Sequence, residues 1–240
     1  MKTRSKFVLL TFAALLAITA TLALGRWQLS RATQKQALQA HVERQSALSK
    51  LDSAALLGGA DLSPYLDRRV VLRGHWIEPQ TVFLENRQMN GKVGLYVVTP
   101  FKLDGSAAVV LVQRGWVARN FLDRTALPAL QTPVGEVQLQ GRIAPPPAKL
   151  YQLGQASNAR IRQNIDLPGF ARESGLAVLP ISVVQTDLAS EGLLRDWPRI
   201  GSGIEKHYAY AFQWFALSAL IAFLYVWFQI VRRFVSRPRT

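Results

Sequence analysis

The residues that could carry chemistry in this chain are few. Histidine occurs at positions 41, 75 and 207, cysteine does not occur, and methionine occurs only at positions 1 and 89. A chain without cysteine has no disulfides, thiolate zinc sites or iron–sulfur clusters, and scattered histidines with little methionine argue against a copper site. Nucleophile-elbow, zinc-protease, phosphate-loop and dinucleotide-binding motifs are also missing from the sequence. We therefore expect no enzymatic activity.

His207 is the most informative of these residues. In a helix it shares one stripe with Tyr210, Ala211 and Trp214, at i+3, i+4 and i+7. Trp214 would lie about 10 Å further along the axis. A neutral imidazole beside an aromatic wall can serve as an axial ligand of a haem iron. The same residues also fit a histidine that only anchors a helix end at a membrane surface, and the pattern leaves both readings open.

Basic residues are predicted at the same level as His207. Arg26, Arg199 and Lys206 could pair with carboxylates such as haem propionates. His41 lies in a polar stretch and His75 in a predicted strand, and we expect both to be structural or exposed to solvent.

Two uncharged stretches can hold this site at a membrane. Residues 7–24 and 208–231 contain no charged side chain, and each is long enough for a spanning helix, which needs roughly 20 apolar residues. We predict transmembrane helices over 7–24 and 207–231. The first stretch is longer than the apolar core of most cleaved signal peptides, which favours a retained anchor.

The charges outside the two spans predict the topology. Tails 1–6 and 232–240 contain no acidic residue and hold half of the net charge of +14, at Lys2, Arg4, Lys6, Arg232, Arg233, Arg237 and Arg239. Positive flanks favour the cytoplasm, so we expect both tails there and residues 25–206 exported. The smaller excess in the middle suits membrane lipid or an anionic ligand. Nucleic acid is not expected as a partner, because no basic and aromatic binding module is present.

The exported segment has β-type patterning. A polar helix is expected over 30–51, followed by strands over 69–77, 81–85, 93–101, 108–117, 137–141, 161–165 and 178–186, with a short helix over 167–174. Asn90-Gly91 and Asp104-Gly105 predict tight hairpin turns, and 191–206 is expected to be a linker. The fold class that follows is two transmembrane helices flanking an antiparallel, β-rich α+β domain, with the strands in a sheet, barrel or sandwich.

Several segments together resemble the surfeit-locus-one family of cytochrome c oxidase assembly factors. The matching segments are 25–29 (GRWQL), 69–74 (RVVLRG), 85–87 (ENR) with 94–101 (GLYVVTPF), 110–117 (VLVQRGWV) and 207–215 (HYAYAFQWF). Three positions, in two segments, depart from the family pattern. Glu205-Lys206 stands where an Asn-Asn pair is often found, and Gln113 stands where Asn is often found.

The resemblance implies a non-enzymatic role in maturing the haem a-containing subunit of the oxidase. Implied partners are that subunit, haem a synthase and membrane lipid, with the chain in a bacterial inner membrane and its middle domain in the periplasm. It also implies that His207 ligates haem a, with Tyr210 and Trp214 as the wall. The motif Arg114-Gly115-Trp116-Val117 ends a predicted strand, where a turn and core role is the default, but a basic and aromatic pair there could also dock a partner. We expect Arg114 and Trp116 to form the surface that docks the oxidase subunit.

Three alternatives remain beside this reading. A cofactor-free scaffold could stabilise an assembly intermediate through protein contacts alone, and the sequence does not separate it from a haem carrier. A copper metallochaperone and a membrane-anchored enzyme are disfavoured, because the chain lacks a soft-ligand cluster and a catalytic constellation.

Overall fold

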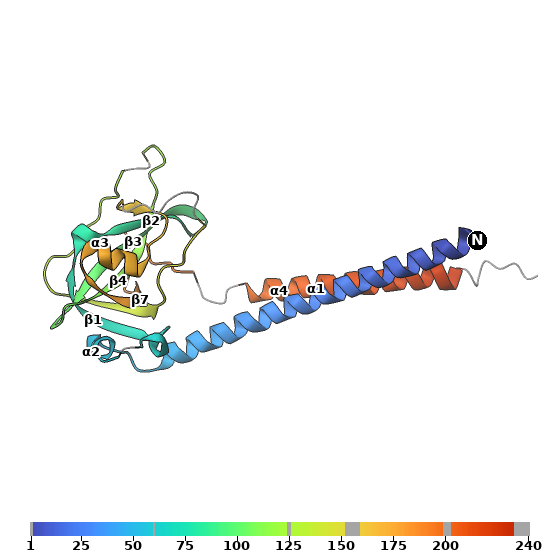
Figure 1. Cartoon of the computed structure of the whole chain (residues 1–240), viewed down its shortest axis with the longest axis horizontal. Helices are drawn as coiled ribbons and strands as arrows, with labels where there is room; N and C mark the ends of the chain where they lie inside the picture. The colour runs from blue at the N-terminus through green and yellow to red at the C-terminus, as the bar shows by residue number, and fades with distance from the viewer. Residues whose placement is uncertain (1, 60, 124–125, 152–158, 199–202, 233–240) are drawn as a thin grey trace, which may run out of the picture. The chain divides into compact units, whose positions relative to one another are not determined.

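The computed structural model describes residues 2–59, 61–123, 126–151, 159–198 and 203–232 (Figure 1). The chain divides into two compact units. One is helical and is formed by residues 1–41 and 199–240, and the other is β-rich and is formed by residues 42–198.

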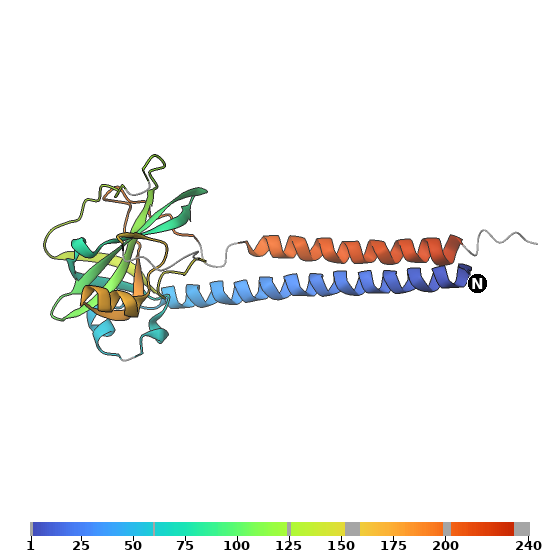
Figure 2. The ribbon, with the colours of Figure 1, turned by 45° about the horizontal axis from the view of Figure 1, so that its top comes forward.

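The helical unit pairs the two ends of the chain. Helix α1 (Lys2–Ala47) and helix α4 (Ile204–Tyr225) lie side by side, as both ribbon views show (Figures 1 and 2), and α4 continues as a π-helical segment, η3 (Val226–Val231). Both helices are long and apolar enough to cross a membrane, and only 6% of the most apolar window of each is buried. Core helices of soluble proteins are mostly buried, and these two are not.

Small side chains let the two helices approach closely. The buried positions in the helical unit include Thr21, Gly25 and Ala32 on α1 and Ala211 and Ser218 on α4. A Cβ atom at Gly25 would lie 2.6 Å from Cε1 of Phe215, so only glycine fits beneath that ring. Thr11 Oγ1 and the Tyr225 hydroxyl are hydrogen-bonded at 2.8 Å. This is the small-residue and hydrogen-bonded packing that membrane helices use.

Helix α1 runs without a break from the apolar stretch into the polar one. The polar helix predicted over 30–51 is therefore confirmed as part of α1, although it ends at Ala47. A short helix, α2 (Ser53–Leu57), follows, because the Asp52 carboxylate accepts a hydrogen bond from the Ala55 amide and caps a new helix start.

The β-rich unit contains every strand that the sequence predicts. The strands are β1 (Arg69–Trp76), β2 (Val82–Met89), β3 (Lys92–Leu103), β4 (Ala108–Ala118), β5 (Val137–Ala144), β6 (Ile161–Arg162) and β7 (Ala177–Gln185). Short 3-10 turns are η1 (Ser63–Tyr65) and η2 (Glu78–Gln80), and helix α3 (Leu167–Ser174) has the predicted bounds. Asn90 and Gly91, with φ of 50° and 74°, form the predicted hairpin turn between β2 and β3.

The strands form one mixed sheet rather than the antiparallel sheet that we expected. Their order is β1-β5-β7-β4-β3-β2-β6, and an additional β1–β3 pairing closes five strands into a ring. Two pairs, β4–β7 and β2–β6, are parallel. The expectation was wrong here because a long connection containing α3 precedes β7, and such a connection allows a parallel return. Alternating hydrophobicity does not report strand direction.

Three apolar clusters lie in the β-rich unit. One lies inside the closed ring and is formed mainly by β1, β3, β4, β5 and β7, with Leu56 and Leu62 packed against it. A second lies under α3, the short helix labelled in Figure 1, and includes Leu167 and Phe170 together with Leu84 and Leu111. A third cluster comprises Phe83, Leu95, Val97 and Leu193. With this core, the unit needs no disulfide to hold its loops in place.

Candidate functional site

His207 lies in the first turn of α4 and faces α1. It is half-buried, and its Nδ1 lies 2.7 Å from Oε1 of Gln28. The bond joins residues that are 179 positions apart in the chain. It links the segment 25–29 to the segment 207–215, two of the segments on which the family resemblance depends.

The aromatic neighbours of His207 are placed differently from one another. Ala211, one turn deeper, is 1% exposed against α1, and Trp214 is half-buried about 10 Å further along α4. Tyr210, three positions after His207, is 51% exposed and lies at the flank of the packed face of α4. The structure therefore puts His207, Ala211 and Trp214 near one partly buried stripe and leaves about half of Tyr210 exposed.

The predicted basic residues are not gathered around the imidazole. Arg26 is exposed and lies two positions before Gln28, so its side chain leaves α1 about 160° away from that residue. Lys206 is exposed beside His207 on α4. Arg199 lies outside the described residues.

Gln28 is the site residue to which sequence reasoning assigned no role. The signal that could have found it is its spacing, because Thr21, Gly25, Gln28 and Ala32 follow a 4-3-4 pattern of small and polar residues on one face of α1. A second amide, Gln36, accepts a hydrogen bond from the Tyr208 hydroxyl at 3.2 Å. Polar contacts between α1 and α4 therefore continue past the His207 level.

Arg114, the first predicted docking residue, is 0% exposed. Its Nη1 donates to Thr132 Oγ1 at 2.9 Å, and its Nη2 donates to Gln131 O at 3.0 Å and to Glu191 Oε2 at 2.6 Å. The guanidinium also lies 4.6 Å from the ring centre of Trp76. Arg114 therefore ties the β4–β5 loop and the segment after β7 to the sheet.

A bulge explains the inward direction of Arg114. Along the β3–β4 ladder, Gly115 pairs with Val97 and Gln113 pairs with Val98, so Arg114 is the extra residue on β4. A bulge redirects the side chain that it contains. The alternation of β4 is broken at this point, and its residues 109–116 are all buried.

Arg195 completes this cluster. Its Nε donates to the Arg114 carbonyl oxygen at 2.7 Å, and its Nη2 lies 3.6 Å from Glu191 Oε2. Burial lowers the pKa of the Arg195 guanidinium, while the negative charges of Glu191 and Asp187 oppose that shift. One carboxylate thus faces two buried guanidinium groups, an arrangement that is stable only while all three are in place.

Trp116, the second predicted docking residue, is 3% exposed. Its Nε1 donates to the Arg87 carbonyl oxygen at 2.9 Å, and its ring covers Gly94, where an added Cβ would lie 2.4 Å from the ring. Burial lowers the pKa of Arg87 and raises the pKa of Tyr96, and the nearby Arg87 charge opposes the shift at Tyr96.

The predicted docking surface at Arg114 and Trp116 is therefore corrected. Neither side chain is open to a partner, since they are 0% and 3% exposed. The prediction read a basic and aromatic pair at a strand end as a surface, but the bulge and the glycine beneath the indole bury both side chains. Their role is to hold the β-rich unit together.

The sequence profile of the SURF1 family matches residues 15–219 of the chain, which include Gln28, Arg114, Trp116 and His207. The chain belongs to the SURF1 family. Its curated relatives include a SURF1-like protein of Rickettsia bellii, 26% identical over 224 residues, which covers 89% of this chain and 86% of the relative. A SURF1-like protein of Drosophila melanogaster is 28% identical over 250 residues, which covers 97% of this chain and 81% of the relative.

A yeast relative has a more informative name. The cytochrome oxidase assembly protein SHY1 of Saccharomyces cerevisiae is 29% identical over 157 residues, which is 63% of this chain. The match spans 40% of the length of the yeast protein. The relatives from Rickettsia and Drosophila are matched over most of their length, so the two-unit layout falls within the matched region.

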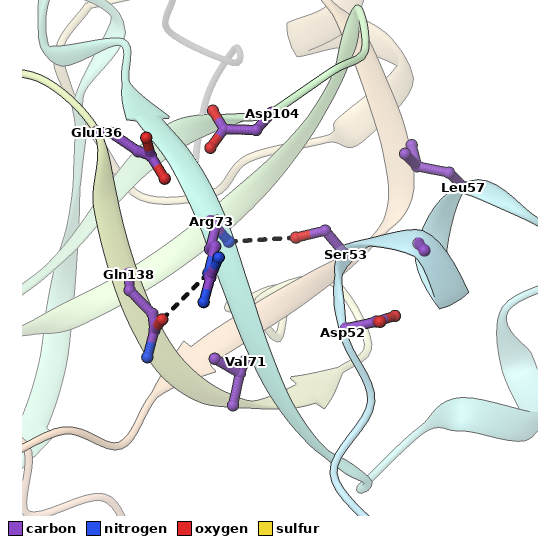
Figure 3. A pocket seen from close by; sticks show the side chains of 9 residues that line it. Asp52, Ser53, Leu57, Val71, Arg73, Asp104, Glu136 and Gln138 are labelled. Atoms are coloured by element: carbon purple, nitrogen blue, oxygen red, sulfur yellow. Dashed lines mark hydrogen bonds between the residues drawn. The ribbon is translucent and has the colours of Figure 1, made fainter.

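The β-rich unit of this SURF1 family member also has an open cleft of about 690 Å³ (Figure 3). Arg73 of β1 stands in its centre, where its Nε donates to Gln138 Oε1 at 3.2 Å and its backbone amide donates to Ser53 Oγ at 3.2 Å. Three carboxylates line the cleft, from Asp52, Asp104 and Glu136. The lining supplies charge but no nucleophile paired with a general base.

The remaining histidines lie apart from His207 in the chain. His41 is exposed on α1, and His75 Nδ1 lies 3.1 Å from Asp104 Oδ1, with its side chain 54% exposed. Among the described residues, no group of three or more His, Asp or Glu side chains is arranged to hold a metal ion. Of the three histidines, His207 is the one that is hydrogen-bonded between the two apolar helices.

Proposed function

We propose that this SURF1 family member is an assembly factor for cytochrome c oxidase and that His207 presents haem a to the haem-containing subunit. The family match and the name of the yeast relative support the assembly role. The observation that carries the haem proposal is the hydrogen bond from His207 to Gln28, which holds a half-buried imidazole where two apolar helices pack.

The packing of the helix pair limits where haem can lie. Gly25 is in contact with the Phe215 ring, and Ala211 and Ala32 are 1% and 0% exposed, so a macrocycle does not fit between α1 and α4. Haem would instead lie on the outer surface of the pair, beside His207 and the exposed edge of Trp214. Its iron would supply an open coordination position to the imidazole. A shallow site of this kind suits a carrier that must release its cargo.

The membrane setting belongs to the same proposal. The two apolar helices would cross a bacterial inner membrane, surrounded by lipid, with basic tails in the cytoplasm and the β-rich unit in the periplasm. The site would then lie at the periplasmic membrane edge, where a membrane-bound haem a synthase can supply an amphipathic haem. Fusion of a reporter that is active only in the periplasm, after residue 150 or after residue 240, tests this arrangement. Activity is expected only for the first fusion, and the reverse result would contradict the topology.

The haem proposal is tested with an optical spectrum and a pyridine haemochrome assay. The full chain is purified from cells that also make haem a, together with His207→Ala and the matched control His41→Ala, which removes an exposed histidine from α1. We expect haem a with the wild type and with His41→Ala, and its loss with His207→Ala. Equal haem in all three proteins would rule out His207 as the ligand.

A cofactor-free scaffold is the second candidate function. The observation that favours it is the close contact of α1 and α4 at Gly25 and Phe215, which leaves no room for a macrocycle between the two helices at that level. A wild-type protein that carries no haem, yet restores oxidase assembly to a strain lacking the gene, would support the scaffold and overturn the haem role.

A further inference from the structure

We propose that Gln28 is a positioning residue that fixes the tautomer of His207 and so decides which imidazole nitrogen binds the ligand. The inference rests on the proposed haem role of His207. It adds a second residue, from the other helix, to the site and predicts how firmly the cargo is held.

The chemistry of the two groups sets the tautomer. In a neutral imidazole, one nitrogen carries a proton and the other a lone pair. Gln28 Oε1, which lies 2.7 Å from His207 Nδ1, can only accept a hydrogen bond. Nδ1 must therefore be the donor, and Nε2 retains the lone pair that a metal requires. Histidine ligands are commonly oriented by a partner on the nitrogen that does not bind the metal.

The packing of the helix pair keeps this contact in place. Three residues before Gln28, Gly25 fits beneath the Phe215 ring, and four residues after it, Ala32 is 0% exposed. On α4, Ala211 is buried one turn after His207. The bond is therefore flanked on both helices by close contacts that fix the distance between the two backbones. Separation of α1 from α4 would remove the bond and free the ring.

The neutral amide has a consequence that a carboxylate would not have. A carboxylate on Nδ1 makes the imidazole more basic and a stronger donor to a metal. An amide orients the ring without adding charge at a half-buried position, where an extra charge is costly. Gln28 thus orients the imidazole of His207 without increasing its strength as a donor to a metal, which fits a protein that must release haem.

The chain supplies a matched control for Gln28. Gln36 is another α1 amide that accepts a hydrogen bond from α4, in this case from Tyr208, and it lies eight positions after Gln28, about 12 Å along the helix axis. Its replacement removes a similar interhelical bond and leaves the imidazole alone. Effects that come only from a weaker helix pair would appear in both variants.

The first measurement is the tautomer of His207 in the haem-free protein, by ¹⁵N NMR of histidine-labelled full-length chain in micelles, with His207→Ala assigning the signal. The proteins are the wild type, Gln28→Met, Gln28→Glu and Gln36→Met. We expect a single Nδ1–H tautomer in the wild type and in Gln36→Met, and a mixture in Gln28→Met. A wild-type ring that is protonated on Nε2 would overturn the proposal, because the amide would then be donating to Nδ1.

The second measurement is haem a binding, followed by absorbance titration. Loss of a partner of a metal-binding histidine typically weakens affinity about 10- to 100-fold, and we expect a loss in that range for Gln28→Met. We expect Gln36→Met to match the wild type and Gln28→Glu to release haem more slowly than the wild type. Equal affinity in Gln28→Met and the wild type would overturn the positioning role.

The two measurements separate failure of this inference from failure of the proposed function. A wild type that does not bind haem would overturn the haem role, whatever the tautomer. If Gln28→Met still disturbs the tautomer in that case, Gln28 orients His207 without serving haem ligation. Loss of haem in His207→Ala with no effect of Gln28→Met on tautomer or affinity would leave the proposed function standing and remove Gln28 from it.

Discussion

The two units of the molecule differ in how far they bury their key polar side chains and how many partners they give them. In the β-rich unit, Arg114 is 0% exposed and its two terminal nitrogens donate to Thr132, Gln131 and Glu191. In the helical unit, His207 is half-buried, and the one hydrogen bond shown for its ring uses Nδ1. The guanidinium is enclosed and held by several partners, whereas the imidazole keeps part of its surface exposed.

This difference indicates where function and where stability reside. A buried guanidinium whose partners come from separate loops is costly to the stability of the fold when it is replaced, and it has no surface that a ligand can reach. An imidazole that is oriented on one side and open on the other can bind a metal at little cost to the fold. The β-rich unit therefore supplies rigidity, and the edge of the helix pair supplies the candidate site.

Replacement of Arg114 by Met should give the largest loss of stability. It leaves the Gln131 carbonyl and the Thr132 hydroxyl without their donor, and it removes the shorter of the two ion pairs of Glu191. Removal of one partner from a buried pair typically destabilises a protein by about 3–5 kcal/mol. The midpoint of urea unfolding of the full chain in micelles, followed by tryptophan fluorescence, measures the change.

Lys149→Met is the matched control for Arg114. Lys149 also pairs with a carboxylate, that of Asp166 at 3.1 Å, but its side chain is 65% exposed. Little change is expected, because exposed pairs contribute little to stability. Equal midpoints for the two variants would show that the Arg114 cluster does not hold the unit together.

Gly25→Val should have the next largest effect, and it acts on the other unit. The new side chain would overlap the Phe215 ring, since even a Cβ would lie 2.6 Å from it. Overpacking of this kind costs about 1–3 kcal/mol. Because the chain has no cysteine, spin labels on Lys6→Cys and Val226→Cys report the separation of α1 and α4 directly. A broader and longer distance distribution is expected.

Two further variants isolate the cause of that change. Ala23→Val places the same side chain on an exposed face of α1 and should leave the distances unchanged. Adding Phe215→Leu to Gly25→Val should restore part of the wild-type distribution, because it makes room for the new side chain. Without that recovery, the close contact at Gly25 would not be what holds the pair.

Much of the fold was predictable because its signals are local. Every strand, the hairpin at Asn90-Gly91 and the helix over 167–174 follow from alternation, turn residues and helix period. The parallel pairing of β7 with β4 was not predictable, since it depends on the path of the whole chain between those two strands. A pattern read along one strand contains no information about its neighbours in the sheet.

The site residues also differ in whether local patterns in the sequence reveal them. His207 stood out because it combines a rare residue type with a helical stripe at the edge of an apolar stretch. Its partner Gln28 lies on another helix, and no local pattern joins positions 179 apart. Arg114 and Trp116 were misread as a surface because the bulge that buries Arg114 depends on the register between β3 and β4.

The smallest expected effect concerns how the β-rich unit responds to alkaline pH. Burial raises the pKa of Tyr96 above its ordinary value near 10, although the charge of Arg87 opposes the shift. As the pH rises, the tyrosine of the unfolded chain ionises first, so stability is intact below the unfolded pKa and is lost as the pH passes through the folded one. Tyr96→Phe removes this proton linkage. Its unfolding midpoint should fall less than that of the wild type between pH 9 and pH 11, a window of about one unit on each side of the ordinary tyrosine pKa.

The matched control Tyr151→Phe changes a ring that is 84% exposed and should follow the wild type. If Tyr96→Phe loses stability as steeply as the wild type between pH 9 and pH 11, ionisation of this buried hydroxyl is not what destabilises the β-rich unit at high pH.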